Sequence, residues 1–185
     1  MGRRLYSTLA SLDGYIADTD GRFDWAMPSD EVHAAVNERL HGVGTFLLGR
    51  RMYEVMRVWD TVDLDDQPSV IVHFAHIWRS ADKVVYSRSL AHVDAPRTRL
   101  ERHFDVDGVR RFTEAAGRDV AIGGPDLAGP AFRAAIVDDV ILYVFPVVVG
   151  DGTAAFPEAR LGLELVEERR FGSGVVRLAY RRTRG

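Results

Sequence analysis

Hydrophobic residues recur along this chain with two different spacings, and the alternation of the two predicts strands followed by helices. Short apolar runs predict buried strands. Apolar residues spaced three or four apart, as at Val32, Val36 and Leu40, predict helices that bury one face. Because helical segments separate most of the strands, the pattern indicates an α/β fold. The predicted strands span 5–12, 45–48, 83–86, 99–102, 140–149, 163–168 and 174–181.

Helix starts are marked by residues that satisfy or avoid free backbone N–H groups. Ser29 is an expected N-cap, and the acids Asp30 and Glu31 after it suit the first turn of a helix. Pro125 suits the first turn of a later helix, where its missing N–H costs nothing. The last two predicted strands follow each other without a helix, which adds an antiparallel edge to the sheet.

The segment from Ala121 to Leu127 passes from an apolar strand through Gly123 and Gly124 into an amphipathic helix. Glycines let backbone approach a ligand closely, and free N–H groups at the start of a helix favour an anion, above all a phosphate. The alternative is that the two glycines form only a tight connection. The motif by itself leaves both interpretations open.

Further polar turns follow other predicted strands. Ligands of an open α/β sheet collect at the carboxyl ends of its strands, where residues 49–51, residues 87–89 and Asp13 are expected. Guanidinium groups bind phosphate oxygens in bidentate fashion, so two arginine-bearing turns and one double-glycine turn suit a 2′-phosphorylated dinucleotide. For each arginine taken singly, the alternative is a solvated surface side chain.

Composition excludes several classes of function. A chain of 185 residues with 46% hydrophobic content suffices for one core, and we expect a single domain over 1–185. The net charge of −3 gives no general attraction to nucleic acid or to an anionic membrane. The absence of cysteine excludes disulfides and thiolate metal sites, and His73 and His76 lack a third ligand, so no metal is expected. Without a long apolar segment, the protein is expected to be cytoplasmic.

An ordered set of short motifs resembles the dihydrofolate reductase superfamily. Within it, the set is most similar to the branch related to the C-terminal reductase domain of bifunctional riboflavin biosynthesis enzymes, over residues 3–182. The resemblance implies a three-layer α/β/α domain around a mixed, mostly parallel sheet with a C-terminal antiparallel hairpin, NADPH as cofactor, and a homodimer. The motifs are SLDGYIA at 11–17, DW at 24–25, LGRRMYE at 48–54, VVYSRSL at 84–90, IGGPDL at 122–127, VDD at 137–139, PVVVGDG at 146–152 and FP at 156–157.

The resemblance also implies which residues meet the cofactor. Gly49, Arg50 and Arg51 would lie at one of its phosphates, and Ser87 and Arg88 at the adenosine side with its 2′-phosphate. Gly123, Gly124 and Leu127 would lie at the pyrophosphate, and Asp13 and Trp25 in the loop over the nicotinamide. Met52 departs from the pattern, because family members usually carry a threonine or serine there whose hydroxyl meets a phosphate.

Asp30 is the candidate catalytic residue. The segment from Met27 to Asp30 resembles the one in which true dihydrofolate reductases hold the carboxylate that binds the pterin. A carboxylate facing an apolar cleft can bind a substrate N–H and assist protonation during hydride transfer. The alternative is an exposed first-turn acid whose charge only favours the helix dipole.

These observations together predict an NADPH-dependent reductase. The nicotinamide is expected beside a cleft between the first helix, the loop from Asp13 to Met27 and the strand 140–149, with a small heterocyclic or carbonyl substrate as hydride acceptor. One alternative is a non-catalytic NADP(H)-binding or sensor protein of the same fold. Another is an interaction module that binds no nucleotide.

Overall fold

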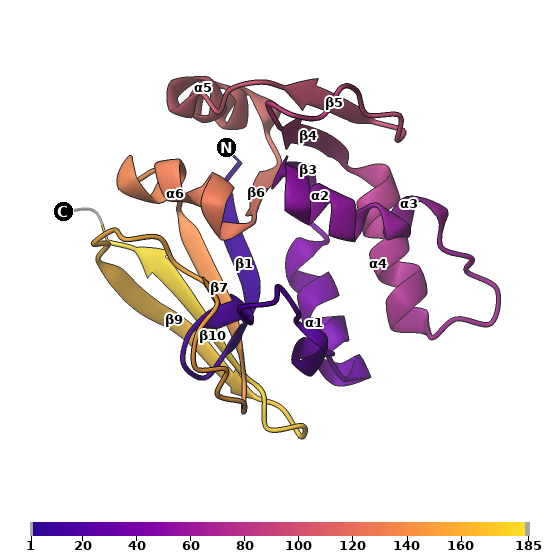
Figure 1. The fold of residues 1–185 in the computed structure, drawn as a ribbon, viewed down its shortest axis with the longest axis vertical. Helices are drawn as coiled ribbons and strands as arrows, with labels where there is room; N and C mark the ends of the chain where they lie inside the picture. The colour runs from indigo at the N-terminus through magenta and orange to yellow at the C-terminus, as the bar shows by residue number, and fades with distance from the viewer. Residues whose placement is uncertain (1, 184–185) are drawn as a thin grey trace.

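The computed structural model describes residues 2–183 as an eight-stranded sheet between two layers of helices (Figure 1). The strands are β1 (Arg4–Ser11), β2 (Tyr15–Ala17), β3 (Val43–Gly49), β4 (Asp82–Tyr86), β5 (Thr98–Glu101), β6 (Asp119–Gly123), β7 (Asp139–Phe145), β8 (Thr153–Ala154), β9 (Leu163–Arg170) and β10 (Val176–Arg182). The helices are the short 3-10 helix η1 (Asp24–Ala26) and the α-helices α1 (Asp30–Leu40), α2 (Arg50–Met56), α3 (Val58–Thr61), α4 (Ser69–Ser80), α5 (Val106–Ala116) and α6 (Pro125–Arg133).

The sheet is mixed and mostly parallel, as predicted. Its strand order is β5-β4-β3-β6-β1-β7-β10-β9, and the first six of these strands are parallel. β10 runs antiparallel to both β7 and β9, which forms the expected hairpin at one edge. Since parallel strands need helical crossovers, both faces of the parallel part are covered by helices.

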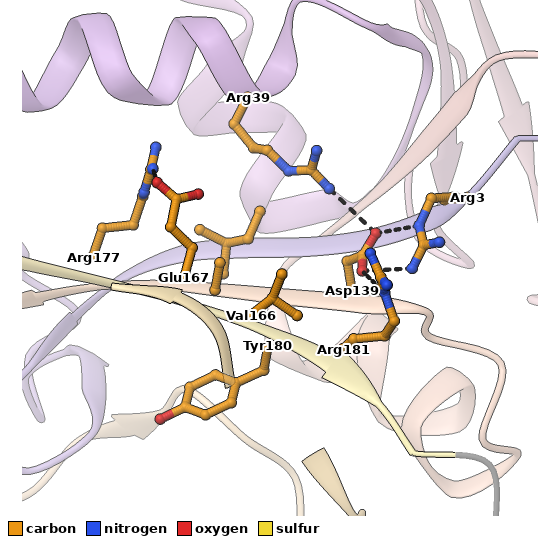
Figure 2. Close-up of a pocket in the computed structure, with 10 residues that line it drawn as sticks. Arg3, Arg39, Asp139, Val166, Glu167, Arg177, Tyr180 and Arg181 are labelled. Carbon is orange, nitrogen blue, oxygen red and sulfur yellow. Dashed lines mark hydrogen bonds and ion pairs between the residues drawn. The ribbon is translucent and has the colours of Figure 1, made fainter. Parts of the chain in front are cut away.

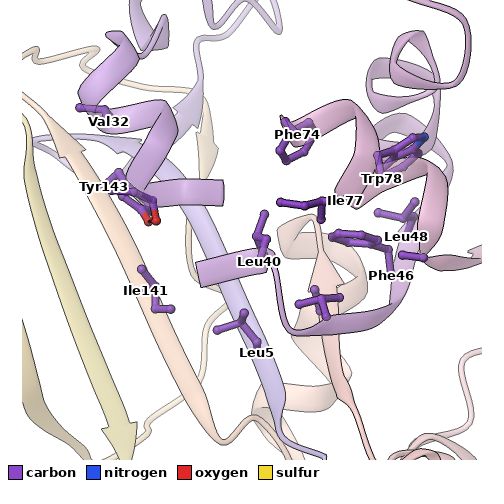
Figure 3. Packing of buried hydrophobic residues seen from close by; sticks show 14 of the residues in the cluster. Leu5, Val32, Leu40, Phe46, Leu48, Phe74, Ile77, Trp78, Ile141 and Tyr143 are labelled. Atoms are coloured by element: carbon purple, nitrogen blue, oxygen red, sulfur yellow. Dashed lines mark hydrogen bonds between the residues drawn. The ribbon is translucent and has the colours of Figure 1, made fainter. Parts of the chain in front are cut away.

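The larger core lies between the sheet and the layer formed by α1 and α4 (Figure 3). Phe46 of β3 packs against Trp78 of α4 with ring centroids 5.4 Å apart. Two hydrogen bonds fix α1: the Tyr143 hydroxyl donates to the Ala35 carbonyl at 3.0 Å in a buried contact, and the Asn37 amide donates to the Val70 carbonyl at 2.8 Å in a partly buried one. A second core, under α5 and α6, covers the opposite face of the sheet. The predicted three-layer arrangement is therefore confirmed.

The helix starts follow the predicted capping chemistry. Ser29 is the N-cap of α1, and its hydroxyl accepts from the Val32 N–H at 3.5 Å. Pro125 occupies the first turn of α6, directly after the N-cap Gly124. No helix within residues 2–183 is long and apolar enough to cross a membrane.

Two predictions about elements were wrong. The strand predicted over 140–149 ends at Phe145, because Pro146 has no N–H to donate to a sheet, and Val148 is 66% exposed instead of buried. The loop predicted from Tyr15 to Met27 contains β2 and η1, and β2 pairs with β8 as a separate two-stranded sheet. Both segments lie at the carboxyl ends of β1 and β7, where the candidate site is located.

Candidate functional site

Three of the predicted polar turns lie side by side at the carboxyl edge of the sheet. β4, β3 and β6 are neighbours, and Gly49 pairs with Tyr86 while Leu48 pairs with Gly123. Because the strand ends are level, three turns lie at the same edge of the sheet. They are the turn with Arg50 and Arg51, the turn with Ser87 and Arg88, and the double-glycine turn. The sequence places each turn after a strand, and the strand order brings the three together.

The two glycines of the turn disfavour side chains for different reasons, close contacts at Gly123 and backbone conformation at Gly124. A Cβ on Gly123 would come within 2.8 Å of Leu48 Cδ2 and 3.2 Å of Met52 Cγ. Gly124 has a φ of +89°, a conformation that side-chain-bearing residues rarely adopt. No side chain caps α6, so the N–H groups of its first turn are available to a ligand. Leu127 is buried beneath the turn, where a Cβ on Gly49 would lie 3.8 Å from Leu127 Cβ.

The arginines of the neighbouring turns are exposed, whereas Ser87 is buried. Arg50 lies 3.6 Å from Glu54 in an exposed ion pair, and Arg51 and Arg88 extend from the same edge into solvent. The Ser87 hydroxyl accepts from the N–H groups of Ser89 and Leu90 at 3.2 and 3.1 Å. Ser87 therefore shapes the turn that presents Arg88.

Asp13 joins the turn after β1 to the loop after β7. Its carboxylate accepts from the Ser11 hydroxyl at 2.6 Å and from the Gly150 N–H at 2.7 Å, and the Val149 N–H lies 3.1 Å from Oδ1. The hydrogen bond from Ser11, together with those from the two backbone N–H groups, lowers the pKa of Asp13 to about 2. Asp13 is thus ionised and holds together two loops beside the expected nicotinamide position.

Trp25 lines a cavity of about 280 Å³ next to these loops. The indole ring meets Phe145 edge-on with centroids 6.3 Å apart, and its buried Nε1–H has no acceptor within residues 2–183. Such an unsatisfied buried donor costs about 1–3 kcal/mol. The cavity wall combines the expected loop and the end of β7 with the turn of the β9–β10 hairpin instead of α1. The residues that line the cavity include Trp25, Met27, Phe145, Val147, Ser173 and Val175.

Asp30 is exposed at the first turn of α1 and does not line this cavity. One turn further along α1, His33 is half-buried, with ring centroids 6.0 Å from Trp59 and 5.7 Å from Phe74. Burial lowers the pKa of His33, and the nearby charge of Asp30 partly opposes this effect. His33 was not among the predicted site residues, although its spacing of three from Asp30 already placed the two on one helix face.

A second cavity lies away from this edge, near the start of β7 (Figure 2). Three arginines converge there on the buried Asp139: Arg3, Arg39 at 3.2 Å and Arg181 at 3.7 Å. Because both carboxylate oxygens already contact arginines, we interpret the cluster as an ion-pair network that ties β1, α1 and β10 to β7.

Comparison with known proteins shows the family of the chain. The family model of the RibD C-terminal domain matches residues 5–177. An uncharacterized protein of Bacillus subtilis, YyaP, is 26% identical over 182 residues, which cover 96% of this chain and 94% of YyaP.

Solved structures share the fold. A Shewanella sp. PV-4 protein named for riboflavin biosynthesis superposes with a TM-score of 0.77 and 21% identity over the whole of both chains. Dihydrofolate reductase from Enterococcus faecalis, determined with NADP(H), gives a TM-score of 0.63 and 14% identity and covers 98% of this chain and 97% of its own. The similarity to the dihydrofolate reductase fold expected from the motifs is therefore confirmed.

Proposed function

The chain belongs to the RibD C-terminal domain family, and from this premise we propose that it is an NADPH-dependent reductase of a small heterocyclic or carbonyl substrate. The observation that carries the proposal is the alignment of three turns at one sheet edge. Two of these turns bring arginines and the third brings an uncapped helix start behind two glycines. A dinucleotide with a 2′-phosphate presents the matching chemistry, which is several phosphate groups along an extended molecule.

The residues at this edge fit that cofactor. The turn at Gly123 and Gly124 leaves its backbone uncovered where a pyrophosphate is expected, and a Cβ at Gly123 would collide with Leu48. Arg51 and Arg88 are exposed on the flanking turns, where a guanidinium can bind phosphate oxygens. We assign Arg50 and Arg51 to a backbone phosphate, and Arg88 to the 2′-phosphate.

When bound, NADPH supplies a hydride to an electrophilic carbon of the substrate, the π electron pair of the C=O or C=N bond takes a proton from water, and NADP⁺ remains. The chain contributes position and charge. Asp13 holds the loops at the carboxyl ends of β1 and β7 together, and Trp25 provides an aromatic wall. Asp30 is the proposed acid that assists the proton transfer.

A non-catalytic NADP(H)-binding protein is the second candidate. One observation favours it: Asp30 is exposed and does not line the cavity at Trp25, so the substrate pocket lacks a carboxylate there. The two functions share the cofactor site and differ in turnover. Tight NADPH binding without oxidation of NADPH by any of a broad panel of carbonyl and heterocyclic compounds supports this candidate.

The cofactor assignment is tested by thermal unfolding with NADPH and with NADH. At about 100 times its dissociation constant, NADPH should stabilise the protein by roughly 2.7 kcal/mol, and NADH should stabilise it much less. Arg88→Gln should remove the preference for NADPH, whereas Arg110→Gln, an exposed arginine on α5, should retain it. Equal stabilisation of the parent by both cofactors contradicts the 2′-phosphate assignment.

Met52 offers a more sensitive test of the pyrophosphate position. Its side chain lies against the double-glycine turn, with Met52 Cβ 3.7 Å from a Cβ built on Gly124. Met52→Thr places a hydroxyl there and should strengthen NADPH binding about tenfold relative to Met52→Val, since a hydrogen bond to a charged group contributes about 1.5–3 kcal/mol. The valine variant has the same shape without the hydroxyl. Equal affinities of the two variants, measured by calorimetry, argue against a phosphate at this turn.

A further inference from the structure

The walls of the cavity at Trp25 carry no charge within residues 2–183. They consist of aromatic, aliphatic and proline side chains and one hydroxyl, that of Ser173. At about 280 Å³, the cavity lies just below the roughly 300–1,000 Å³ of sites for drug-sized ligands, so it suits a molecule of one or two rings. A phosphate or carboxylate buried in such a cavity loses its hydration and gains no cation in return.

The loops that contribute to the cavity also carry exposed apolar side chains. Leu12 and Val148 are both 66% exposed, and Phe23 and Met27 are 45% and 74% exposed. These side chains lie on the loops that meet at the carboxyl ends of β1 and β7, where the Leu12 N–H donates to the Val147 carbonyl at 2.8 Å. Exposed apolar side chains on loops that also line an uncharged cavity are consistent with a binding site for an apolar molecule.

Charged groups on the adjoining segments do not compensate for the missing cation. Arg169 of β9 is engaged by Glu31 at 3.3 Å, and its guanidinium lies 4.7 Å from the centre of the Phe171 ring. Asp24 and Asp30 flank the segment that contributes Trp25 and Met27, and both are acids that repel an anionic ligand.

From these observations we propose that the substrate is a small, neutral, largely apolar carbonyl compound that lies against the indole ring of Trp25. This inference rests on the proposed reductase function and specifies its substrate class. It excludes a phosphorylated or carboxylated substrate at this site.

The test compares two aldehydes of similar shape. p-Tolualdehyde carries a methyl group at the position where 4-formylbenzoate carries a carboxylate. Their dissociation constants are measured by calorimetry on the protein with saturating NADP⁺, which does not reduce them, so binding is read without turnover. We expect p-tolualdehyde to bind at least about tenfold more tightly than 4-formylbenzoate. Equal or reversed affinities, or no measurable binding of p-tolualdehyde, overturn the inference.

A charge placed in the wall should change this preference. Ser173→Arg introduces a cation at the exposed hairpin turn that lines the cavity, and it should tighten 4-formylbenzoate about tenfold. Ser80→Arg makes the same exchange at an exposed position at the end of α4 and should have no effect. If Ser173→Arg leaves both affinities unchanged, the aldehydes bind elsewhere and the inference is overturned.

The contact with the Trp25 ring is tested with Trp25→Ala, which removes the aromatic wall. This variant should weaken p-tolualdehyde and p-xylene about fivefold each. Unchanged affinities of both probes contradict a ligand that lies against the Trp25 ring. NADPH binding is followed separately by thermal unfolding, so a failure of the reductase proposal is distinguished from a failure of the substrate class.

Discussion

At the scale of single residues, Asp30 and His33 share one face at the start of α1. Burial lowers the pKa of His33, and the charge of Asp30 raises it. Asp30→Asn removes the attraction, so the pKa of His33 should fall further, which an NMR titration of the His33 ring measures. Glu31→Gln removes the next charge along α1 and serves as the control. An unchanged pKa of His33 in Asp30→Asn contradicts the coupling.

The same variant tests the proposed catalytic role of Asp30. If its carboxylate assists protonation, Asp30→Asn should lower kcat about 100- to 10,000-fold and leave NADPH affinity unchanged. The alternative role, a first-turn acid at the N-terminal end of α1, predicts only a small loss of helix stability. A kcat within about twofold of the parent value returns Asp30 to that alternative and leaves the site without a named acid.

At the scale of elements, buried Asp139 joins β7 to three other elements through Arg3, Arg39 and Arg181. Asp139→Asn leaves three guanidinium groups without their shared partner and should lower the free energy of unfolding by about 3 kcal/mol. Urea unfolding measures the change. The control is Asp107→Asn, which breaks an exposed pair with Arg110 and should cost less than about 1 kcal/mol. Equal losses in the two variants contradict the network.

Asp13 joins the turn after β1 to the loop after β7, and the stabilisation that it gives the folded protein depends on pH. The pKa of Asp13 in the folded protein, about 2, lies below its ordinary value of 3.8. The folded state therefore favours the ionised form of Asp13. The stabilisation of the folded protein by this carboxylate is present above the ordinary pKa of 3.8 and is lost as the pH falls toward 2. Asp13→Asn should speed hydrogen exchange at the Val149 and Gly150 amides at neutral pH. Asp151→Ala, which removes the acceptor of the Gly152 N–H in the same loop, should leave those two amides protected.

At the scale of the whole molecule, the β9–β10 edge predicts self-association. β9 is the last strand of the sheet, and Leu165 and Val166 are 46% and 53% exposed in its middle. We expect a homodimer that covers them, because an unpaired strand edge with apolar side chains tends to acquire a partner. Light scattering measures the mass in solution. Val166→Glu should shift it to the monomer, whereas Val58→Glu, an equally exposed position on α3, should not. A monomeric parent protein contradicts the expectation.

Several features of this protein are determined by the sequence alone, because they depend on contacts between near neighbours in the chain. Local sterics and hydrogen bonding define the helices. The signals are the spacing of Val32, Val36 and Leu40, the N-cap at Ser29 and the proline at 125. The double glycine at 123–124 defines a strand-to-helix turn for the same reason. These features sufficed to predict an α/β fold, and the ordered set of short motifs supplied the resemblance that implied its three layers.

Other features were decided only by tertiary structure, because they depend on residues far apart in the chain. The placement of β3 between β4 and β6 sets the arginine turns and the glycine turn level at one edge. Asp13 reaches the amides of Val149 and Gly150, and the turn at Ser173 joins Trp25 around one cavity. Sheet order and loop packing follow from burying the whole core, and no local pattern encodes them. The sequence therefore determined which turns follow the strands and carry glycines or arginines, and tertiary packing decided which of them meet and that the adjoining cavity is uncharged.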